Sequence, residues 1–158
     1  MGLGVREVRC GTRLSFPGAP GFSIEVLHPG PEDSYLSGRE ENDHSLALRL
    51  RGGNSRLLIL GDLKEKGVAR LFQRGDDLRA DVLVAPHHGR PNLLWPEILE
   101  AVRPAALVIT GGGAQSSRRV AASVEAKGIP VFATWRRGAV RMLWSASRGW
   151  EASYWRDG

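Results

Sequence analysis

Two short apolar runs, each followed by polar residues of the metal-binding type, constrain the fold of this chain more than any other feature. Residues 57–60 precede Asp62, and residues 81–86 precede His87 and His88. The segment between the two runs is long enough for one helix, so the pattern predicts a strand–helix–strand unit with parallel strands. The carboxyl ends of both strands would then meet at one edge of the sheet, where open α/β sheets place ligands.

A carboxylate and imidazoles at one edge are a ligand set that zinc, manganese or iron accepts. The sequence therefore predicts that Asp62 and the pair His87 and His88 share one site, although they lie far apart in the chain. Each piece also has a structural interpretation, because Asp after Gly is typical of a turn in which the carboxylate bonds its own backbone. The histidine pair is harder to explain by packing, since two neutral donors at a strand end contribute little to a core.

A β-hairpin adds a third polar group to this edge. Residues 46–50 alternate apolar and polar side chains, residues 52–54 (Gly-Gly-Asn) predict a turn, and residues 56–60 return the chain. The hairpin brings residues 42–45 (Asn-Asp-His-Ser) to the same end as Asp62.

The rest of the chain continues the alternation of strands and helices. Residues 22–27 predict a strand that stops at His28, a third histidine for which a structural role is favoured because Pro29 holds it extended. Further helices are predicted at residues 63–72, 91–102 and 117–127, and further strands at residues 105–110, 131–134, 139–144 and 150–155, the last two as a hairpin.

Two late features have open interpretations. Residues 111–113 (Gly-Gly-Gly) lie between a predicted strand and a helix, where a helix amino terminus would allow phosphate contact. A plain tight turn is favoured, because the segment fits neither the dinucleotide pattern nor the P-loop. For the tryptophans, packing is favoured over stacking on bases; these are Trp135, Trp144, Trp150 and Trp155.

Charge and cysteine content limit the function classes. The net charge of +5 allows an anionic partner such as nucleic acid, although a solvated basic surface is equally common. The single cysteine, Cys10, excludes an intrachain disulfide framework and a cysteine-rich zinc site. No apolar run approaches the roughly 20 residues that span a bilayer, and the first residues lack the apolar core of a secretion signal. We expect a soluble, untargeted chain and leave its compartment open.

Taken together, these segments resemble the carboxy-terminal half of a metallo-β-lactamase-fold hydrolase, and more narrowly the hydrolase domain of ComEC-type competence proteins, which take up DNA. The resemblance implies an αββα sandwich, of which residues 1–158 would form one partial α/β (α+β) domain without a linker, with a mixed sheet and about three helices. The segments that carry it follow the family's order and spacing: residues 26–29, 42–46, 58–62, 81–89 and 134–140.

The resemblance also implies roles for three residues. Asp62 matches the carboxylate that bridges two metals, and His88 matches the late histidine ligand directly before a glycine. His87 would be the catalytic histidine, which supports a ligand or contacts the substrate. The implied cofactor is zinc or manganese in a two-metal site, and the implied chemistry is attack of metal-activated water on a phosphodiester, as in a nuclease.

The chain also departs from the family pattern. The main ligand cluster, His-x-His-x-Asp-His, is absent, residues 111–117 lack the usual Asn and His, and Arg90 stands where serine is common. A stable zinc site needs three or four protein ligands, whereas Asp62 and His88 supply two. We therefore expect weak or absent metal binding and no hydrolysis by this chain alone, either because it is a fragment or because it is degenerate.

Three functions follow as hypotheses. The first is half of a metal-dependent hydrolase linked to competence DNA uptake, in a parent protein attached to the inner membrane. The second is a non-catalytic domain that binds nucleic acid or a protein partner through its basic surface, and the third is an unrelated α/β domain with a glycine-rich nucleotide loop. Half a sandwich would leave an apolar sheet face uncovered, so we expect an amino-terminal half in cis or self-association, unless residues before Phe22 cover that face.

Overall fold

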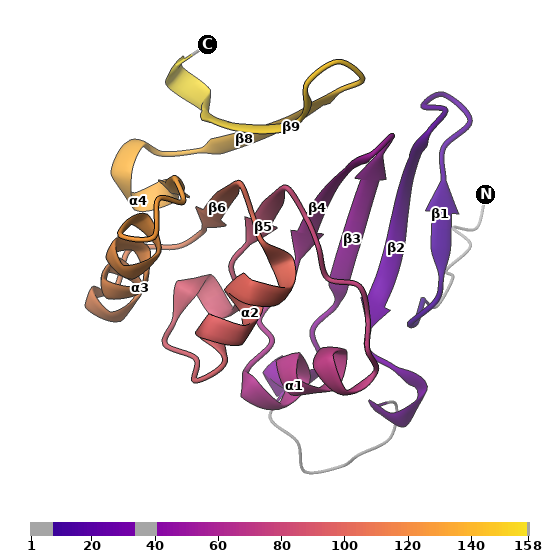
Figure 1. The fold of residues 1–158 in the computed structure, drawn as a ribbon, viewed down its shortest axis with the longest axis horizontal. Helices are drawn as coiled ribbons and strands as arrows, with labels where there is room; N and C mark the ends of the chain where they lie inside the picture. Colours follow the sequence, from indigo (N-terminus) through magenta and orange to yellow (C-terminus); the bar gives the residue numbers. More distant parts are fainter. Residues whose placement is uncertain (1–7, 34–40, 158) are drawn as a thin grey trace, which may run out of the picture.

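A seven-stranded mixed sheet forms the centre of the fold, which the computed structural model describes for residues 8–33 and 41–157 (Figure 1). The strands lie in sequence order. The first four pair antiparallel and the last four pair parallel, so the fourth strand belongs to both parts. They are β1 (Arg13–Ser15), β2 (Phe22–His28), β3 (Ala47–Gly52), β4 (Ser55–Ile59), β5 (Val82–Val84), β6 (Ala106–Ile109) and β7 (Val131–Ala133).

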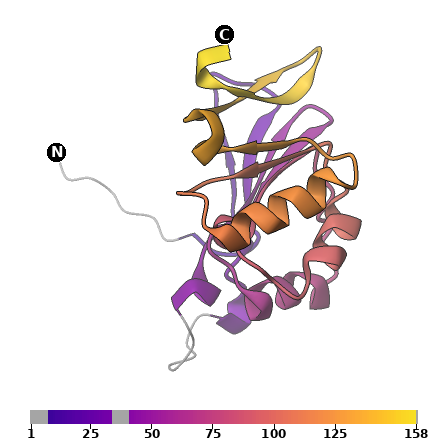
Figure 2. The same ribbon diagram turned by 90° about the vertical axis from the view of Figure 1, so that its left-hand side faces the viewer.

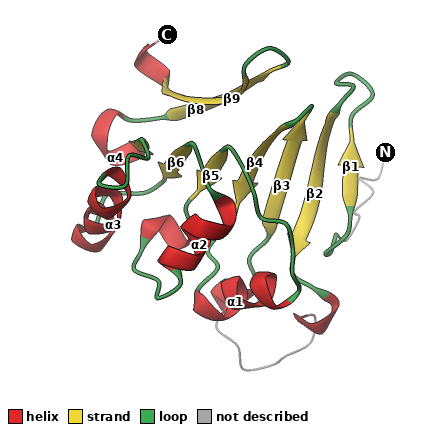
Figure 3. Ribbon diagram, viewed as in Figure 1, coloured by secondary structure: helices red, strands yellow, loops and turns green. Residues whose placement is uncertain are grey.

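Helices connect the parallel strands (Figure 3). They are α1 (Glu65–Gln73) between β4 and β5, α2 (Trp95–Val102) between β5 and β6, and α3 (Gln115–Glu125) between β6 and β7, followed by the single turn α4 (Thr134–Arg137). The predicted mixed α/β class and the three longer helices are confirmed. The predicted start of α2 at residue 91 is wrong, because Asn92 Oδ1 accepts a hydrogen bond from the Leu94 N–H (2.8 Å) and forms a turn before the helix.

The helices pack against one face of the sheet and form the main core. Side chains that alternate along the strands face them, such as Leu58, Leu83 and Leu107, which are all fully buried. Helix α1 contributes Val68 and Leu71, one helical turn apart, to the same core. Continuous apolar character in β5 and β6 follows from this arrangement, because both faces of these strands are covered.

A terminal hairpin covers part of the other face. Strands β8 (Val140–Ser145) and β9 (Gly149–Tyr154) form a separate two-stranded sheet, as predicted from the sequence. Met142 and Trp150 of the hairpin pack with Leu57, Val82 and Val108, which point away from the helices. The expectation that this face needs residues before Phe22 or a second copy is therefore wrong for the patch around Val82.

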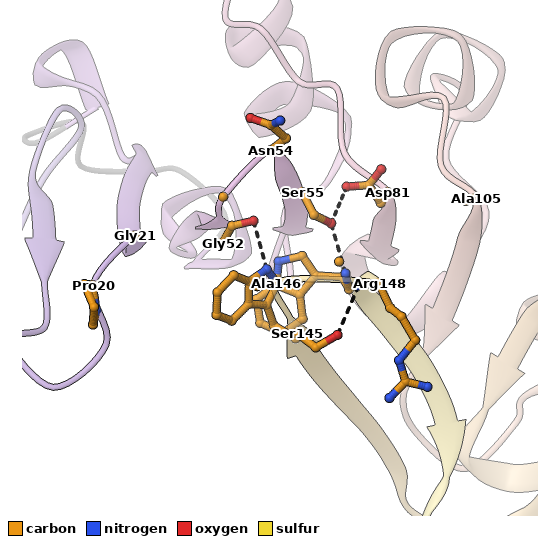
Figure 4. A pocket seen from close by; sticks show the side chains of 14 residues that line it. Pro20, Gly21, Gly52, Asn54, Ser55, Asp81, Ala105, Ser145, Ala146 and Arg148 are labelled. Carbon is orange, nitrogen blue, oxygen red and sulfur yellow. Dashed lines mark hydrogen bonds between the residues drawn. The ribbon is translucent and has the colours of Figure 1, made fainter.

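Hydrogen bonds hold the hairpin against the turn between β3 and β4. The Trp144 Nε1–H donates to the Gly52 carbonyl (2.8 Å), and the Trp150 N–H donates to Ser55 Oγ (3.0 Å), which in turn donates to Asp81 Oδ2 (2.7 Å). These groups surround a pocket of about 680 Å³, shown in Figure 4. The contacts agree with a packing role for both tryptophans.

Gly52→Ala is expected to lower the free energy of unfolding by about 1–3 kcal/mol, the usual effect of overpacking. An added Cβ would lie 2.2 Å from Trp144 Nε1, so the indole would have to move and lose its bond to Gly52. Denaturant unfolding measures the change. Gly18→Ala is the matched control, because it has open space and no left-handed φ, and equal losses in both variants would contradict the contact.

The hairpin lies at the opposite end of the molecule from α1, as both Figure 1 and Figure 2 show. At the carboxyl end of β7, the Ala133 N–H donates a hydrogen bond to Tyr154 Oη of the hairpin (3.1 Å). Within the described residues, no helix combines the length and the apolar character that crossing a membrane requires.

Candidate functional site

The structure brings Asp62 and His88 together at the carboxyl ends of β4 and β5. These strands pair in parallel, with Leu58 beside Leu83 and Ile59 beside Val84, so the residues that follow them emerge at one edge. Asp62 Oδ1 lies 3.3 Å from His88 Nε2. Both side chains are about half exposed, at 45% and 53%, so a further group can reach them from solvent.

The two histidines lie in an unusual backbone conformation. His87 and His88 have φ angles of 48° and 57°, in the left-handed region that side chains with a Cβ rarely adopt. Each costs about 1–2 kcal/mol in this conformation. The His87 N–H donates to the Gly61 carbonyl (2.9 Å) and so ties the turn to the residue before Asp62. Such outliers concentrate at functional sites, where the surrounding structure holds them.

His87 lies beside residues 42–45, the polar segment that the hairpin was predicted to bring to the same end as Asp62. Its Nε2 is 3.5 Å from Asn42 Nδ2, so one member of the polar group at residues 42–45 reaches the site. Burial lowers the pKa of His87, and the charge of Arg90 lowers that pKa further, against the opposing effect of Asp62. The ring is therefore neutral at pH 7 and offers one donor and one acceptor nitrogen.

Two threonines, one directly after β6 and one directly after β7, also lie at this edge of the sheet. His88 Nδ1 is 3.1 Å from Thr110 Oγ1. Thr134 accepts from the Gly111 N–H (2.9 Å) and donates to the Gly111 carbonyl (3.0 Å). The sequence alone did not predict a functional role for Thr110. Its position at the end of a buried strand is the sequence feature that could have indicated one.

His28 belongs to a different, buried cluster. It is fully buried, with Nδ1 3.2 Å from Asp33 Oδ2 and Nε2 2.9 Å from the Asp43 carbonyl oxygen. Asp43 Oδ1 in turn accepts a hydrogen bond from the Gly67 N–H of α1 (3.1 Å). This arrangement agrees with the structural role that the sequence favoured for His28.

The described residues do not fit a complete metal centre. Within residues 8–33 and 41–157, no three His, Cys, Asp or Glu side chains are grouped so that they could hold a metal ion. Asp62 and His88 supply two donors, whereas structural and catalytic zinc sites use three or four protein ligands. No reaction step through a metal can therefore be derived from these residues alone.

Comparisons with known proteins identify the fold first. No family model matches the chain. A point mutant of the CmlA beta-hydroxylase superposes with a TM-score of 0.52, at 14% sequence identity, over 81% of this chain and 32% of that one. The chain therefore has the metallo-β-lactamase fold, which here consists of a seven-stranded mixed sheet with helices.

Sequence similarity then identifies the family. Competence protein ComA of Neisseria gonorrhoeae is 31% identical over 126 residues, which make up 77% of this chain and 18% of that protein. ComE operon protein 3 of Bacillus subtilis (strain 168) is 26% identical over 111 residues, which make up 70% of this chain and 13% of that protein. The chain is a ComEC-like domain of the metallo-β-lactamase fold, and it spans less than a fifth of these relatives.

Proposed function

We propose that this domain contributes Asp62 and His88 to the metal site of a hydrolase that acts on DNA during competence. The observation that carries the proposal is the 3.3 Å separation of Asp62 Oδ1 and His88 Nε2 at one sheet edge. The relatives that are named competence proteins support the connection with competence, and the metallo-β-lactamase fold is the fold that the resemblance in sequence to a metal-dependent hydrolase implies. The remaining ligands would come from another segment of the protein.

The surroundings of His88 suit a ligand. Metal-binding histidines usually bond a second group through the nitrogen that faces away from the metal, which fixes the ring and its tautomer. Thr110 Oγ1 is placed to accept a hydrogen bond from the His88 Nδ1–H, which leaves the Nε2 lone pair directed toward Asp62. The metal would be zinc or manganese, which accept both imidazole and carboxylate. His87, neutral and beside Asn42, would contact the substrate.

The proposal is tested by measuring zinc and manganese affinity by calorimetry, in the chain alone and with an amino-terminal half supplied in cis. We expect weak binding by the chain alone and tight binding by the completed protein. Asp62→Asn and His88→Ala should each weaken the tight binding at least about 100-fold, because each removes a ligand. Asp77→Asn is the matched control, since this exposed carboxylate pairs with Arg56 (2.6 Å).

The incomplete ligand set within the described residues favours a second candidate, a domain that binds a partner without catalysis. The same experiment separates the two functions. If the completed protein binds no metal, or if the Asp62 and His88 variants bind it as tightly as the Asp77 variant does, the ligand assignment is wrong and the binding function is favoured.

A further inference from the structure

Arginine side chains are concentrated on one face of strands β1 to β4, near the start of β4. This is the face that carries Leu58, because Arg49 lies directly opposite Leu58 and side chains two residues apart along a strand share a face. Two neighbouring cross-strand rows run over this face. The first row is Arg13, Glu25 and Arg49, and the second, which we call the serine row, is Ser15, Ser23, Arg51 and Arg56.

A carboxylate occupies the middle of the first row. Glu25 Oε2 accepts hydrogen bonds from Arg49 Nε (3.1 Å) and Arg49 Nη2 (2.7 Å), and Glu25 Oε1 lies 3.7 Å from Arg13 Nη2. Burial works against the charged form, but the hydrogen bond from Arg49 and the charges of the arginines hold the pKa of Glu25 below its usual value. The first row therefore shows how this face of the sheet accommodates a carboxylate.

The serine row has arginines but no carboxylate between them. Arg51 and Arg56 lie directly opposite each other on β3 and β4, an arrangement of like charges that is destabilising. Arg56 is paired with Asp77 (2.6 Å). Arg51 Nε is buried and has no hydrogen-bond partner among the described residues, and the Glu25 carboxylate is 3.9 Å from it. Burial lowers the pKa of Arg51, and the charges of Arg49 and Arg56 lower it further, against the opposing effect of Glu25.

We propose that the serine row binds a carboxylate side chain of an acidic protein segment. The carboxylate would take the position that Glu25 has in the first row and would accept hydrogen bonds from the Arg51 guanidinium. Its charge would offset the repulsion between Arg51 and Arg56, and such charge-assisted hydrogen bonds are stronger than neutral ones. The row is open to a ligand, because Ser15 is exposed, Ser23 has a short side chain, and the Arg51 side chain is 34% exposed.

The distribution of charge favours a peptide with spaced carboxylates over a nucleic acid strand. Beyond Arg56, the surface continues into a pocket of about 230 Å³ that Arg79 and Arg103 also line, so a segment with several carboxylates meets further cations. Carboxylates of the chain itself lie among the arginines and would repel a backbone that is charged at every link; they are Glu25, Asp77 and Asp81. The serine row also lies near the start of β4, whereas Asp62 follows the end of this strand, so the surface is separate from the proposed metal site.

The test measures the fluorescence anisotropy of a short, labelled polyglutamate peptide that is titrated with the 158-residue chain in metal-free buffer of low ionic strength. We expect saturable binding that weakens as salt is added, because salt screens exposed charges. Arg51→Gln should weaken the binding at least about tenfold, the effect of losing a hydrogen bond to a charged group. Arg119→Gln is the matched control, because it removes the same charge from an exposed position on α3 and should leave the affinity unchanged.

A second variant supplies the missing carboxylate within the chain. Ser23→Glu places it directly beside Arg51, so this variant should lose peptide binding and should unfold at a higher urea concentration than the unsubstituted chain. Ser23→Gln is the matched control, because its side chain has the same size without the charge and should retain peptide binding. Circular dichroism spectra establish that each variant is folded.

The proposal is overturned if polyglutamate does not bind saturably, if the Arg51 and Arg119 variants bind alike, or if the Ser23→Glu variant still binds. It is also overturned if a single-stranded oligonucleotide of the same length binds more tightly than the peptide and depends on Arg51, because the serine row would then be a nucleic-acid surface. Since no metal is present and Asp62 and His88 are unchanged, either outcome leaves the metal proposal standing.

Discussion

Replacing Gly61 with alanine is expected to lower the free energy of unfolding by about 3 kcal/mol. The substitution should also displace the turn formed by His87 and His88. Gly61 has a φ of 56°, a left-handed conformation that costs a residue with a Cβ about 1–2 kcal/mol. The new Cβ would also lie 2.7 Å from the Leu46 carbonyl oxygen. Because that atom belongs to the backbone of the neighbouring segment, it cannot rotate away, and overpacking adds about 1–3 kcal/mol.

Gly75→Ala separates the two contributions. Gly75 has a φ of 69°, but an added Cβ there meets no atom within 4 Å, so only the backbone cost remains. Denaturant unfolding should therefore show a loss of about 1–2 kcal/mol for the control and clearly more for Gly61→Ala. The Gly61 carbonyl also accepts from His87, so the histidine resonances should shift in the Gly61 variant alone. Equal losses and unchanged histidine signals would contradict this account.

The sequence predicted the sheet well wherever a local pattern carried the information. Alternation in β3 and β4 and a Gly-Gly-Asn turn were sufficient for the hairpin, and continuous apolar runs were sufficient for β5 and β6. The crossover through α1 then fixed which strand ends meet. Asp62 and His88 were placed at one edge on this argument, and the structure places them 3.3 Å apart.

The sequence was uninformative wherever the structure depends on distant contacts. Strand β1 has three residues and partly exposed side chains, so it shows no period and forms because β2 offers it an edge. The position of the β8–β9 hairpin depends on the bond from Trp144 to Gly52, which are far apart in the chain. A hairpin pattern predicts pairing between its own strands, but it does not predict the surface on which they pack.

The sequence also could not predict the backbone conformation and the side-chain contacts of the histidines in the site. Left-handed φ angles are rare for histidine, so the conformation of His87 and His88 has no local signature. The contact of His88 with Thr110 follows from the parallel pairing of β5 and β6, which brings the ends of those strands together. The residue types were sufficient to predict a site with histidines. The direction in which each imidazole ring points depends on the left-handed turn at His87 and His88, which the residue types do not predict.

Asp33→Ala is expected to lower the free energy of unfolding by about 3–5 kcal/mol, the usual effect of removing one partner of a buried charged pair. Asp33 is fully buried and accepts from the Gly30 N–H (2.8 Å), lies 3.2 Å from His28 Nδ1, and pairs with Arg70 through its other oxygen. Without the carboxylate, a buried histidine and a largely buried arginine lose their shared acceptor.

A surface ion pair provides the comparison for Asp33→Ala. Glu125 pairs with Arg136 at 2.6 Å, both are more than a third exposed, and the hydrogen bond from Arg136 holds the pKa of Glu125 below its usual value. Glu125→Ala should cost at most about 1 kcal/mol, since water replaces the lost contact. His28 also bonds the Asp43 carbonyl, directly after Asn42, so only the Asp33 variant should shift the His87 signals. If both variants lose the same stability in denaturant unfolding, the buried cluster around Asp33 does not hold the segment that reaches the site.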